Sequence, residues 1–441
     1  MKTKNKTLIL LEIAVVLFSV FLVALPVMAI AAEQNQEMQK ASPITTASKH
    51  DFTLDIYGNA NEDDTIDMRD LTYVKLIFFG KKPVTELADA KYDGKINPLD
   101  FIQIKLIIVG KEKELTFVDS AKRTVTVKKP IERIVTMNTE AFEMICTLKA
   151  TDKVVGVSKY IVEDEVFYPG FSDYPNVGTP WSIDYEVLLG CEPDVVFTYS
   201  KWPKPSALED KLKGTDITVI RFDYNKPSTF VEDVKKLGYI LAKGEEADEF
   251  IDFYNEQMGK ISERVEKLSE EDKPKVYLEA DFGGGKIYYT CGKGHGHHEI
   301  LVRAGGKNIF DDVTYGKEIS PEDVIARNPE IIVKYKWPAG GIDKDVSDTK
   351  DLEEIRDEIL GRPELKHVSA VENKKVYVFT WYTTRGAARY FLGIGYLAKW
   401  FHPKLFEDLH PKANYQEYLT RFQGLDIDLN KQGVFAYPEP G

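Results

Sequence analysis

The sequence predicts two α/β lobes that are joined by a long helical spine and preceded by a small all-α domain. An apolar strand pattern at residues 193–203 returns at residues 329–338, which indicates two similar lobes. Between the two copies, apolar residues recur at helical spacing over residues 228–268. A second repeat, in which an acidic loop is followed by a helix, lies near the N-terminus and predicts the small domain.

The composition excludes several classes of function. The net charge of −13 over 441 residues argues against a nucleic-acid partner, which would select a basic face. The sequence contains no nucleophile elbow, no His-Glu-x-x-His motif and no P-loop. We therefore expect a protein that is not an enzyme and does not bind nucleic acid.

The N-terminal segment, residues 1–31, predicts export. Three lysines precede an apolar run that ends near Ala-Ile-Ala, a sequence typical of signal-peptidase sites. The run is nearly long enough to span a bilayer, so a cleaved signal peptide and an uncleaved signal anchor both stay open. No cysteine follows the run, so a lipoprotein anchor is not expected. Residues 32–50 are polar and predict a flexible linker, and the rest should lie outside the cell or at its surface.

The small domain, residues 51–113, consists of two copies of an acidic loop followed by an amphipathic helix. The copies align thirty residues apart, and each helix closes on a glycine, Gly80 or Gly110, placed as a C-cap. One such helix could not bury its apolar face alone, whereas two copies can cover each other.

Both loops carry oxygen ligands at the spacing that wraps around a hard cation such as Ca²⁺. Positions 1, 3, 5, 7, 9 and 12 of the first loop are Asn59, Asn61, Asp63, Thr65, Asp67 and Asp70. The second loop has a lysine at position 3, where a ligand belongs, and offers Asp89, Asp93, Lys95, Asn97 and Asp100. Position 7, which is Thr65 or Lys95, would contribute its backbone carbonyl. We expect calcium at these loops.

Residues 57–111 resemble the duplicated calcium loops of type I dockerins. The resemblance rests on the loop spacing and on the sequence Lys-Leu-Ile-x-x-Gly that closes both copies. It implies bound Ca²⁺ and a cohesin-like partner at the cell surface. Met68-Arg69 and Pro98-Leu99 depart from the Ser/Thr residues with which dockerins often read cohesins.

Strand and helix patterns alternate in both lobes, which favours mostly parallel sheets. In the N-terminal lobe, residues 115–226, a helix is expected at 141–148 and strands at 124–127, 134–136, 154–157 and 195–197. In the C-terminal lobe, residues 273–441, a closing helix is expected at 387–401 and strands at 276–278, 331–333 and 376–379. Residues 227–272 connect the lobes as one helix with Ser228 as its N-cap, or as two helices broken near Gly244.

Each copy of the repeated strand pattern ends in Lys-Trp-Pro, so each lobe offers a tryptophan at a strand exit. In an open α/β sheet, ligands bind beyond the carboxyl ends of the strands. Large aromatic side chains there suit a broad, flat or macrocyclic ligand, and arginines can pair with its carboxylates. The candidate ligand-binding residues are Tyr160, Trp181, Trp202, Trp337, Trp381, Tyr382, Arg385 and Arg389.

Three of the seven histidines, His295, His297 and His298, form a cluster in the C-terminal lobe. Such a cluster can bind a transition metal or supply an axial ligand to a chelated iron or cobalt ion. The alternative is an exposed loop whose histidines share no function.

Several short motifs of the α/β region stand in a characteristic order. They include Pro-Ile-Glu-Arg-Ile-Val at 130–135, Glu-Pro-Asp at 192–194 and Ala-Gly-Gly-Lys-Asn-Ile at 304–309. Over residues 115–405 the chain thereby resembles the substrate-binding proteins of ABC importers for iron-siderophores, haem and cobalamin, the class III periplasmic binding proteins. The resemblance implies two lobes that close to a limited extent on a metal chelate. It also implies a permease that pairs with one glutamate on each lobe, by position Glu143 and Glu299.

The sequence therefore predicts an exported binding protein that captures an iron complex or a corrinoid and delivers it to an ABC permease. One alternative stays open. The dockerin-like pair would then bind a surface partner, and the lobes would recognise another ligand, such as an oxyanion. Saturable binding of chelates by the lobes distinguishes the two.

Overall fold

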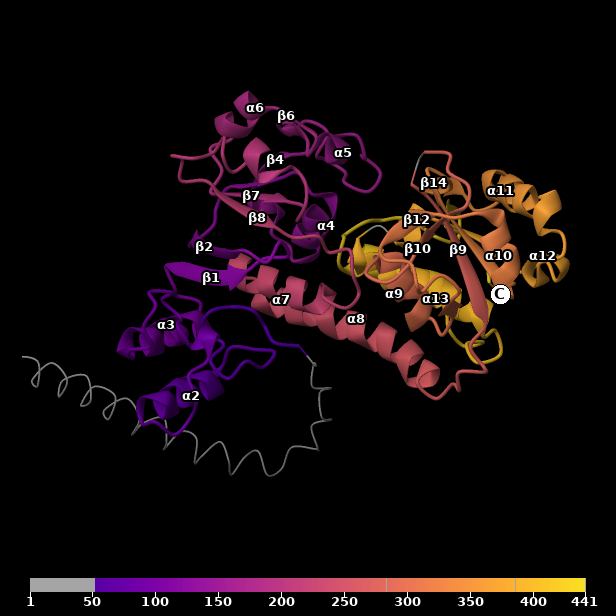
Figure 1. Cartoon of the computed structure of the whole chain (residues 1–441). Helices are drawn as coiled ribbons and strands as arrows, with labels where there is room; N and C mark the ends of the chain where they lie inside the picture. Colours follow the sequence, from indigo (N-terminus) through magenta and orange to yellow (C-terminus); the bar gives the residue numbers. More distant parts are fainter. Residues whose placement is uncertain (1–51, 283, 385, 441) are drawn as a thin grey trace, which may run out of the picture. The chain divides into compact units, whose positions relative to one another are not determined.

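The computed structural model describes residues 52–282, 284–384 and 386–440 of the chain. Figure 1 shows how the elements of this part follow one another in sequence. The expected signal segment 1–31 and linker 32–50 lie outside the described residues. Among the described residues, no helix is long and apolar enough to cross a membrane.

The small domain contains the two predicted helices, α2 (Met68–Phe78) and α3 (Pro98–Ile108), which pack against each other. Their start signals are the same, because Asp67 with Asp70 and Asn97 with Asp100 each form a capping box. Gly80 and Gly110 follow the two helices with φ of +65° and +64°. The repeat thus produces two equal helical units that end on a left-handed glycine, as predicted.

The small domain is joined to the N-terminal lobe by hydrogen bonds and by a shared core. The hairpin of β1 (Glu114–Val118) and β2 (Thr124–Lys128) is bridged to residue Ile56, which lies opposite Phe117. The Tyr57 N–H donates to the Thr116 carbonyl at 2.9 Å. Ile56 and Phe117 belong to the same buried cluster, so the domain packs as an extension of the lobe.

The N-terminal lobe has a parallel sheet, as predicted, with the strand order β4-β3-β7-β8. Its strands are β3 (Ile134–Thr136), β4 (Val154–Val157), β7 (Val195–Thr198) and β8 (Thr218–Arg221). Its helices are α4 (Thr139–Thr147), α5 (Lys159–Val162) and α6 (Tyr185–Gly190), and a short hairpin is formed by β5 (Gly178–Thr179) and β6 (Ser182–Ile183).

The connecting segment is two helices, α7 (Phe230–Leu241) and α8 (Gly244–Val265), rather than one. Ala242 ends α7 with a left-handed φ of 56°. The two helices then pack closely, since a Cβ on Gly238 would lie 2.7 Å from the Cβ of Ala247. Thr229, not Ser228, precedes the first turn of α7. The break near Gly244 is therefore correct, and the single long helix is wrong.

The C-terminal lobe has a sheet with the order β11-β9-β13-β15-β17, in which only the β15–β17 pair is antiparallel. Its strands are β9 (Lys275–Phe282), β11 (Lys307–Asn308), β13 (Ile331–Trp337), β15 (Val376–Thr380) and β17 (Ala436–Tyr437). Short strands β10 (Tyr289–Cys291), β12 (Gly316–Glu318), β14 (Gly341–Asp345) and β16 (Gln432–Val434) pair outside this sheet. The helices are α9 (Gly296–Arg303), α10 (Pro321–Arg327), α11 (Lys350–Leu360), α12 (Ser369–Glu372), α13 (Tyr390–Phe401) and α14 (Pro411–Arg421).

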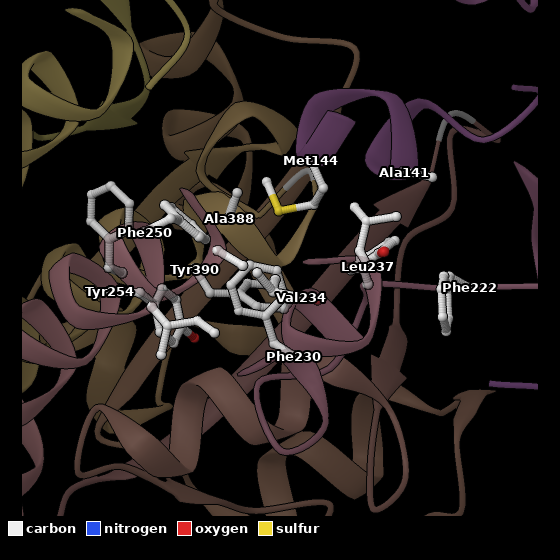
Figure 2. Close-up of a cluster of buried hydrophobic side chains, with 14 of the residues drawn as sticks. Ala141, Met144, Phe222, Phe230, Val234, Leu237, Phe250, Tyr254, Ala388 and Tyr390 are labelled. Carbon is white, nitrogen blue, oxygen red and sulfur yellow. The ribbon is translucent and has the colours of Figure 1, made fainter. Parts of the chain in front are cut away.

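One hydrophobic core runs through both lobes and the connecting helices. Figure 2 shows Met144 of α4, Phe230 of α7, Phe250 of α8 and Tyr390 of α13 in one cluster of buried side chains. Phe230 and Phe250 are edge-to-face, with ring centroids 6.0 Å apart. Because the same cluster takes side chains from each lobe and from α7 and α8, these helices hold the lobes together by packing as well as by chain connection.

Candidate functional site

The two strand exits that carry the repeated motif present their tryptophans in the same way. Trp202 follows β7 with 44% of its surface exposed, and Trp337 ends β13 with 42% exposed. Both Trp-Pro peptide bonds are cis. Large aromatic side chains that are partly exposed at strand exits can supply contact area for a ligand. The two exits are therefore the first elements of the candidate ligand site.

Two further predicted residues of the N-terminal lobe are also exposed. Tyr160 of α5 and Trp181 are 43% and 62% exposed, and their rings meet edge to face at 6.3 Å between centroids. Trp381 and Tyr382 differ, because they are half-buried and pack against the main core. Arg385 lies outside the described residues.

Arg389 forms a buried ion pair with Glu143 of α4. Its Nε and Nη2 donate to Oε1 and Oε2 of Glu143, both at 2.9 Å, and the two side chains are 0% and 1% exposed. Tyr418 donates its hydroxyl proton to Oε1 of Glu143 at 2.8 Å, and the guanidinium lies 3.8 Å from the Phe167 ring centroid. Burial alone would lower the pKa of Arg389, but the Glu143 carboxylate together with Tyr415 and Tyr168 holds that pKa well above the usual value.

The placement of this pair does not support two of the predicted roles. Glu143 does not reach the surface, where a permease would bind it, and the Arg389 guanidinium faces Glu143 instead of an open ligand site. The pair instead connects α4 of one lobe to the start of α13 in the other. Glu299 is half-buried, and its Oε2 accepts the Ser228 N–H at 3.1 Å.

The three clustered histidines point to different neighbours. His295 caps α9, because its Nδ1 accepts the His297 N–H at 3.2 Å. His297 is buried, and its ring centroid lies 4.4 Å from that of Tyr335. His298 Nδ1 lies 3.0 Å from the Asn308 side-chain amide. Burial, followed by the charge of Lys226, lowers the pKa of His295 to about 4, so the ring is neutral at physiological pH.

This geometry does not support the predicted transition-metal site. Because Nδ1 of His295 accepts a backbone proton, the neutral ring carries its own proton on Nε2 and offers a donor there. The His295 and His297 ring centroids lie 5.1 Å apart, but the His297 ring is buried against Tyr335 and the His298 ring faces Asn308. Within the described part of the chain, no group of three or more His, Cys, Asp or Glu side chains is arranged to hold a metal ion.

An aromatic cluster that sequence reasoning missed surrounds His295 at the strand exits of the C-terminal lobe. Phe282 at the end of β9 is 44% exposed, and Tyr315 is 49% exposed. Ring centroids lie 5.1 Å apart for Phe282 and Tyr335, and 5.0 Å apart for His295 and Tyr315. Strand alternation could have found Tyr335, because it lies between two lysines whose side chains occupy the other face of β13.

Those lysines form a charged ladder with β9. Lys334 donates to Glu279 at 2.7 Å and Lys336 donates to Asp281 at 2.5 Å, between residues that are paired across the two strands. Arg362 adds two hydrogen bonds to Glu279, at 2.6 and 2.9 Å. Neither lysine is therefore free to bind a ligand, and the open aromatic face is the one next to His295.

Loops of the N-terminal lobe contact this region. The Lys201 ammonium lies 4.7 Å from the centroid of the Tyr315 ring. The Tyr390 hydroxyl donates to the Asn225 carbonyl at 2.5 Å, and a Cβ on Gly296 would lie 2.2 Å from the same oxygen. Only glycine fits at the start of α9 at this distance. Residues after β7 and after β8 thus meet the exits of the second sheet.

The acidic loops of the small domain are built alike, with one difference. Asp70 and Asp100 are fully buried, and each accepts two backbone N–H groups from its own loop. Burial raises the pKa of Asp70 to about 6. In the first loop the Arg69 guanidinium lies 3.0 Å from Asp63 and 2.9 Å from Asp67, at two of the predicted ligand positions. The Oδ1 atom of Asn59, at position 1, is buried without a hydrogen-bond partner in the described residues.

A cavity of about 280 Å³ lies between the small domain and helices α7 and α8. Its wall includes Glu112, Lys129 and Tyr239. Lys129 donates to Glu112 Oε1, and the Tyr239 hydroxyl accepts the N–H of Ile66 at 3.1 Å. The cavity contains none of the predicted ligand-binding residues, so we assign it to the junction between the small domain and the spine.

The family model described as periplasmic binding protein matches residues 134–381, more than half of the chain. It starts after the small domain, so it says nothing about the calcium loops.

Individual relatives cover most of the two lobes. The chain is 25% identical to the uncharacterized ABC transporter substrate-binding lipoprotein YvrC of Bacillus subtilis, over 73% of the chain and 96% of that protein. It is 23% identical to the vitamin B12-binding protein of Vibrio cholerae, over 56% of the chain and 90% of that protein. The crystal structure of the TroA-like periplasmic binding protein FepB from Veillonella parvula matches with a TM-score of 0.61 and 25% identity, over 73% of the chain and 98% of that structure.

Proposed function

The chain belongs to the periplasmic binding protein family, and from this premise we propose that it captures an iron complex or a corrinoid and delivers it to an ABC permease. The iron complex would be a siderophore or haem. The protein would act after export, outside the cell or at its surface. Binding and delivery require no covalent chemistry, so the proposal is consistent with the absence of catalytic motifs from the sequence.

The observation that carries the proposal is the pair of half-exposed tryptophans at matching strand exits of the two sheets. Trp202 and Trp337 stand where open α/β sheets bind ligands. Phe282, which is paired with Trp337 across β9 and β13, and Tyr315 are also about half exposed. Exposed aromatic rings contribute large contact areas at low conformational cost, which suits a macrocycle or a bulky chelate. The name of the Vibrio cholerae relative states that that protein binds vitamin B12, a corrinoid.

The permease is the proposed partner. Glu299 is the remaining candidate for docking on the C-terminal lobe, because it is only half-buried and accepts a single hydrogen bond among the described residues. Glu143 forms a buried ion pair with Arg389, so another residue of the N-terminal lobe would have to dock to the permease. Replacing Glu299 by Gln should weaken permease-dependent uptake and leave ligand affinity unchanged.

The binding proposal is tested by titrating the full chain with haemin, a ferric hydroxamate siderophore and cyanocobalamin while following tryptophan fluorescence. We expect saturable one-to-one quenching by one class, with at least tenfold weaker binding after Trp202→Ala or Trp337→Ala. Trp400→Phe is the matched control, because Trp400 is buried and stacks on Tyr377 at 4.8 Å. Absence of binding to all three compounds by the folded protein would contradict the proposal.

We also propose that the first loop of the small domain binds Ca²⁺ in competition with Arg69. The uncompensated oxygen of Asn59 and the carboxylates of Asp63 and Asp67 support this. As it stands, the loop holds a guanidinium on two of those carboxylates, so the side chain must leave before an ion can enter. Arg69 is 60% exposed, which makes its displacement cheap.

A second function of the small domain is favoured by an exposed apolar stripe on α3. Leu99, Ile102 and Val109 are 54%, 48% and 53% exposed and recur at helical spacing. We propose that this stripe binds a cohesin-like surface partner, as the dockerin resemblance implies. Leu99→Asp with Ile102→Asp should abolish binding of a cohesin domain to the full chain without affecting chelate binding. Equal binding by the variant would reject this function.

A further inference from the structure

We infer that the rim formed by Lys201, Lys226, His295 and Tyr315 binds an anionic group of the ligand. The inference rests on the proposed function, because it concerns the same site and narrows the class of ligand. The rim joins loops after β7 and β8 of the N-terminal lobe to the start of α9 and the segment before β12 of the C-terminal lobe.

Two lysines of the N-terminal lobe reach this rim without a carboxylate partner. The Lys201 ammonium lies over the Tyr315 ring, at 4.7 Å from its centroid. Lys226 directly follows Asn225, whose carbonyl oxygen accepts the Tyr390 hydroxyl proton and would lie 2.2 Å from a Cβ on Gly296, at the start of α9 beside His295. Among the described residues, neither lysine forms an ion pair with Asp or Glu.

The acidic side chains near these lysines are engaged elsewhere. Asp223 accepts the N–H and the hydroxyl proton of Ser200, at 2.8 and 2.5 Å. Glu299 accepts the N–H of Ser228, and Asp311 lies 3.4 Å from the ammonium of Lys293. Among the described residues, none of these three carboxylates forms an ion pair with Lys201 or Lys226, and Asp311 is paired with Lys293.

His295 adds a neutral hydrogen-bond donor. Its Nδ1 is used by the His297 N–H, so the ring proton is on Nε2. The ring meets Tyr315 and Phe282 at centroid distances of 5.0 and 5.7 Å, and both of those aromatic side chains are about half exposed. A donor beside two ammonium groups, next to an apolar face, suits a carboxylate or another oxyanion on an otherwise apolar ligand.

The buried Arg389 strengthens this assignment. Its guanidinium is held by Glu143 and is fully buried, so it does not offer its charge to a ligand. Lys336, at the exit of β13, is paired with Asp281. Among the described residues of this rim, Lys201 and Lys226 are the cations that can recognise an anion. The ligand that fits is a chelate with free carboxylates or a comparable negative group, in preference to a neutral corrinoid.

The test compares the full-length chain with Lys201→Gln, Lys226→Gln and the double variant. The probes are haemin, its dimethyl ester, ferric citrate and cyanocobalamin, followed by tryptophan fluorescence and calorimetry. The ester matches haemin but lacks its two carboxylates. Lys267→Gln is the control variant, because Lys267 is an exposed lysine just after α8. Circular dichroism checks that each variant is folded.

We expect haemin or ferric citrate to bind, with affinity reduced about tenfold by each substitution and about a hundredfold by both. If haemin is the probe that binds, the ester should bind about a hundredfold more weakly and should not respond to the substitutions. An anionic probe that binds the double variant as tightly as the original chain overturns the inference and leaves the proposed function standing. Binding of cyanocobalamin alone does the same. Binding of no probe removes the proposed function and the inference with it.

Discussion

Removing the negative charge from the ion pair between the lobes should destabilise the whole protein. Glu143→Gln keeps the size of the side chain but leaves the Arg389 guanidinium, which is 0% exposed, without its counter-charge. Breaking a buried ion pair on one side costs about 3–5 kcal/mol of unfolding free energy. Both bidentate contacts at 2.9 Å are affected, and the Tyr418 hydroxyl loses a charged acceptor. We therefore expect a loss near the upper part of that range.

The assay is urea unfolding followed by circular dichroism at pH 7. Glu249→Gln is the control, because Glu249 pairs with Arg421 at the same 2.9 Å between side chains that are 43% and 44% exposed. That substitution should cost less than about 1 kcal/mol. Combining Glu143→Leu with Arg389→Met should restore most of the loss, since an apolar pair needs no counter-charge. A loss below about 1 kcal/mol for Glu143→Gln would refute the reasoning.

Three further substitutions test single groups. Burial raises the pKa of Asp233 to about 7, above its ordinary value near 4. The folded state therefore holds this proton more tightly than the unfolded state, and stability should fall as the pH rises from about 4 to about 7, by up to about 4 kcal/mol. Asp233→Asn should remove this part of the pH profile of urea midpoints, and an unchanged profile would contradict the assignment. Arg69→Ala should tighten Ca²⁺ binding, measured by calorimetry, by about tenfold, because the cation no longer competes for Asp63 and Asp67. Equal Ca²⁺ affinity in the original chain and in Arg69→Ala would show that Arg69 does not compete with Ca²⁺ for the first loop. Asp70→Asn should weaken Ca²⁺ binding in both chains.

Much of the fold could be predicted because the patterns that form it are local. The buried strand β7 is a short apolar run between Glu-Pro-Asp and Lys-Trp-Pro, and the echoed β13 starts after Asn-Pro-Glu and ends on the Trp of its own Lys-Trp-Pro. The thirty-residue repeat likewise fixed the caps and ends of α2 and α3. Such signals lie within a few residues of the structure that they produce.

The features that were missed depend on contacts between distant residues. Gly244 indicated a break between α7 and α8, but the residue that adopts the left-handed conformation is Ala242, beside the close packing of Gly238 on Ala247, and no local preference marks it. The pair of Glu143 and Arg389 joins positions 246 residues apart, so it cannot be read from spacing. The three histidines looked like a metal site, but His295 uses its Nδ1 to cap α9 and His298 faces Asn308.

The most direct test of the central claim is the position of a bound metal. Crystals of the full chain grown with whichever chelate saturates it would be measured at the absorption edge of iron or cobalt. The account predicts one anomalous peak, which marks the metal of a single bound chelate. That chelate should contact Trp202 and Trp337, the two half-exposed tryptophans at the strand exits. A single chelate bound elsewhere, for example in the cavity beside Glu112 and Tyr239, would contradict it.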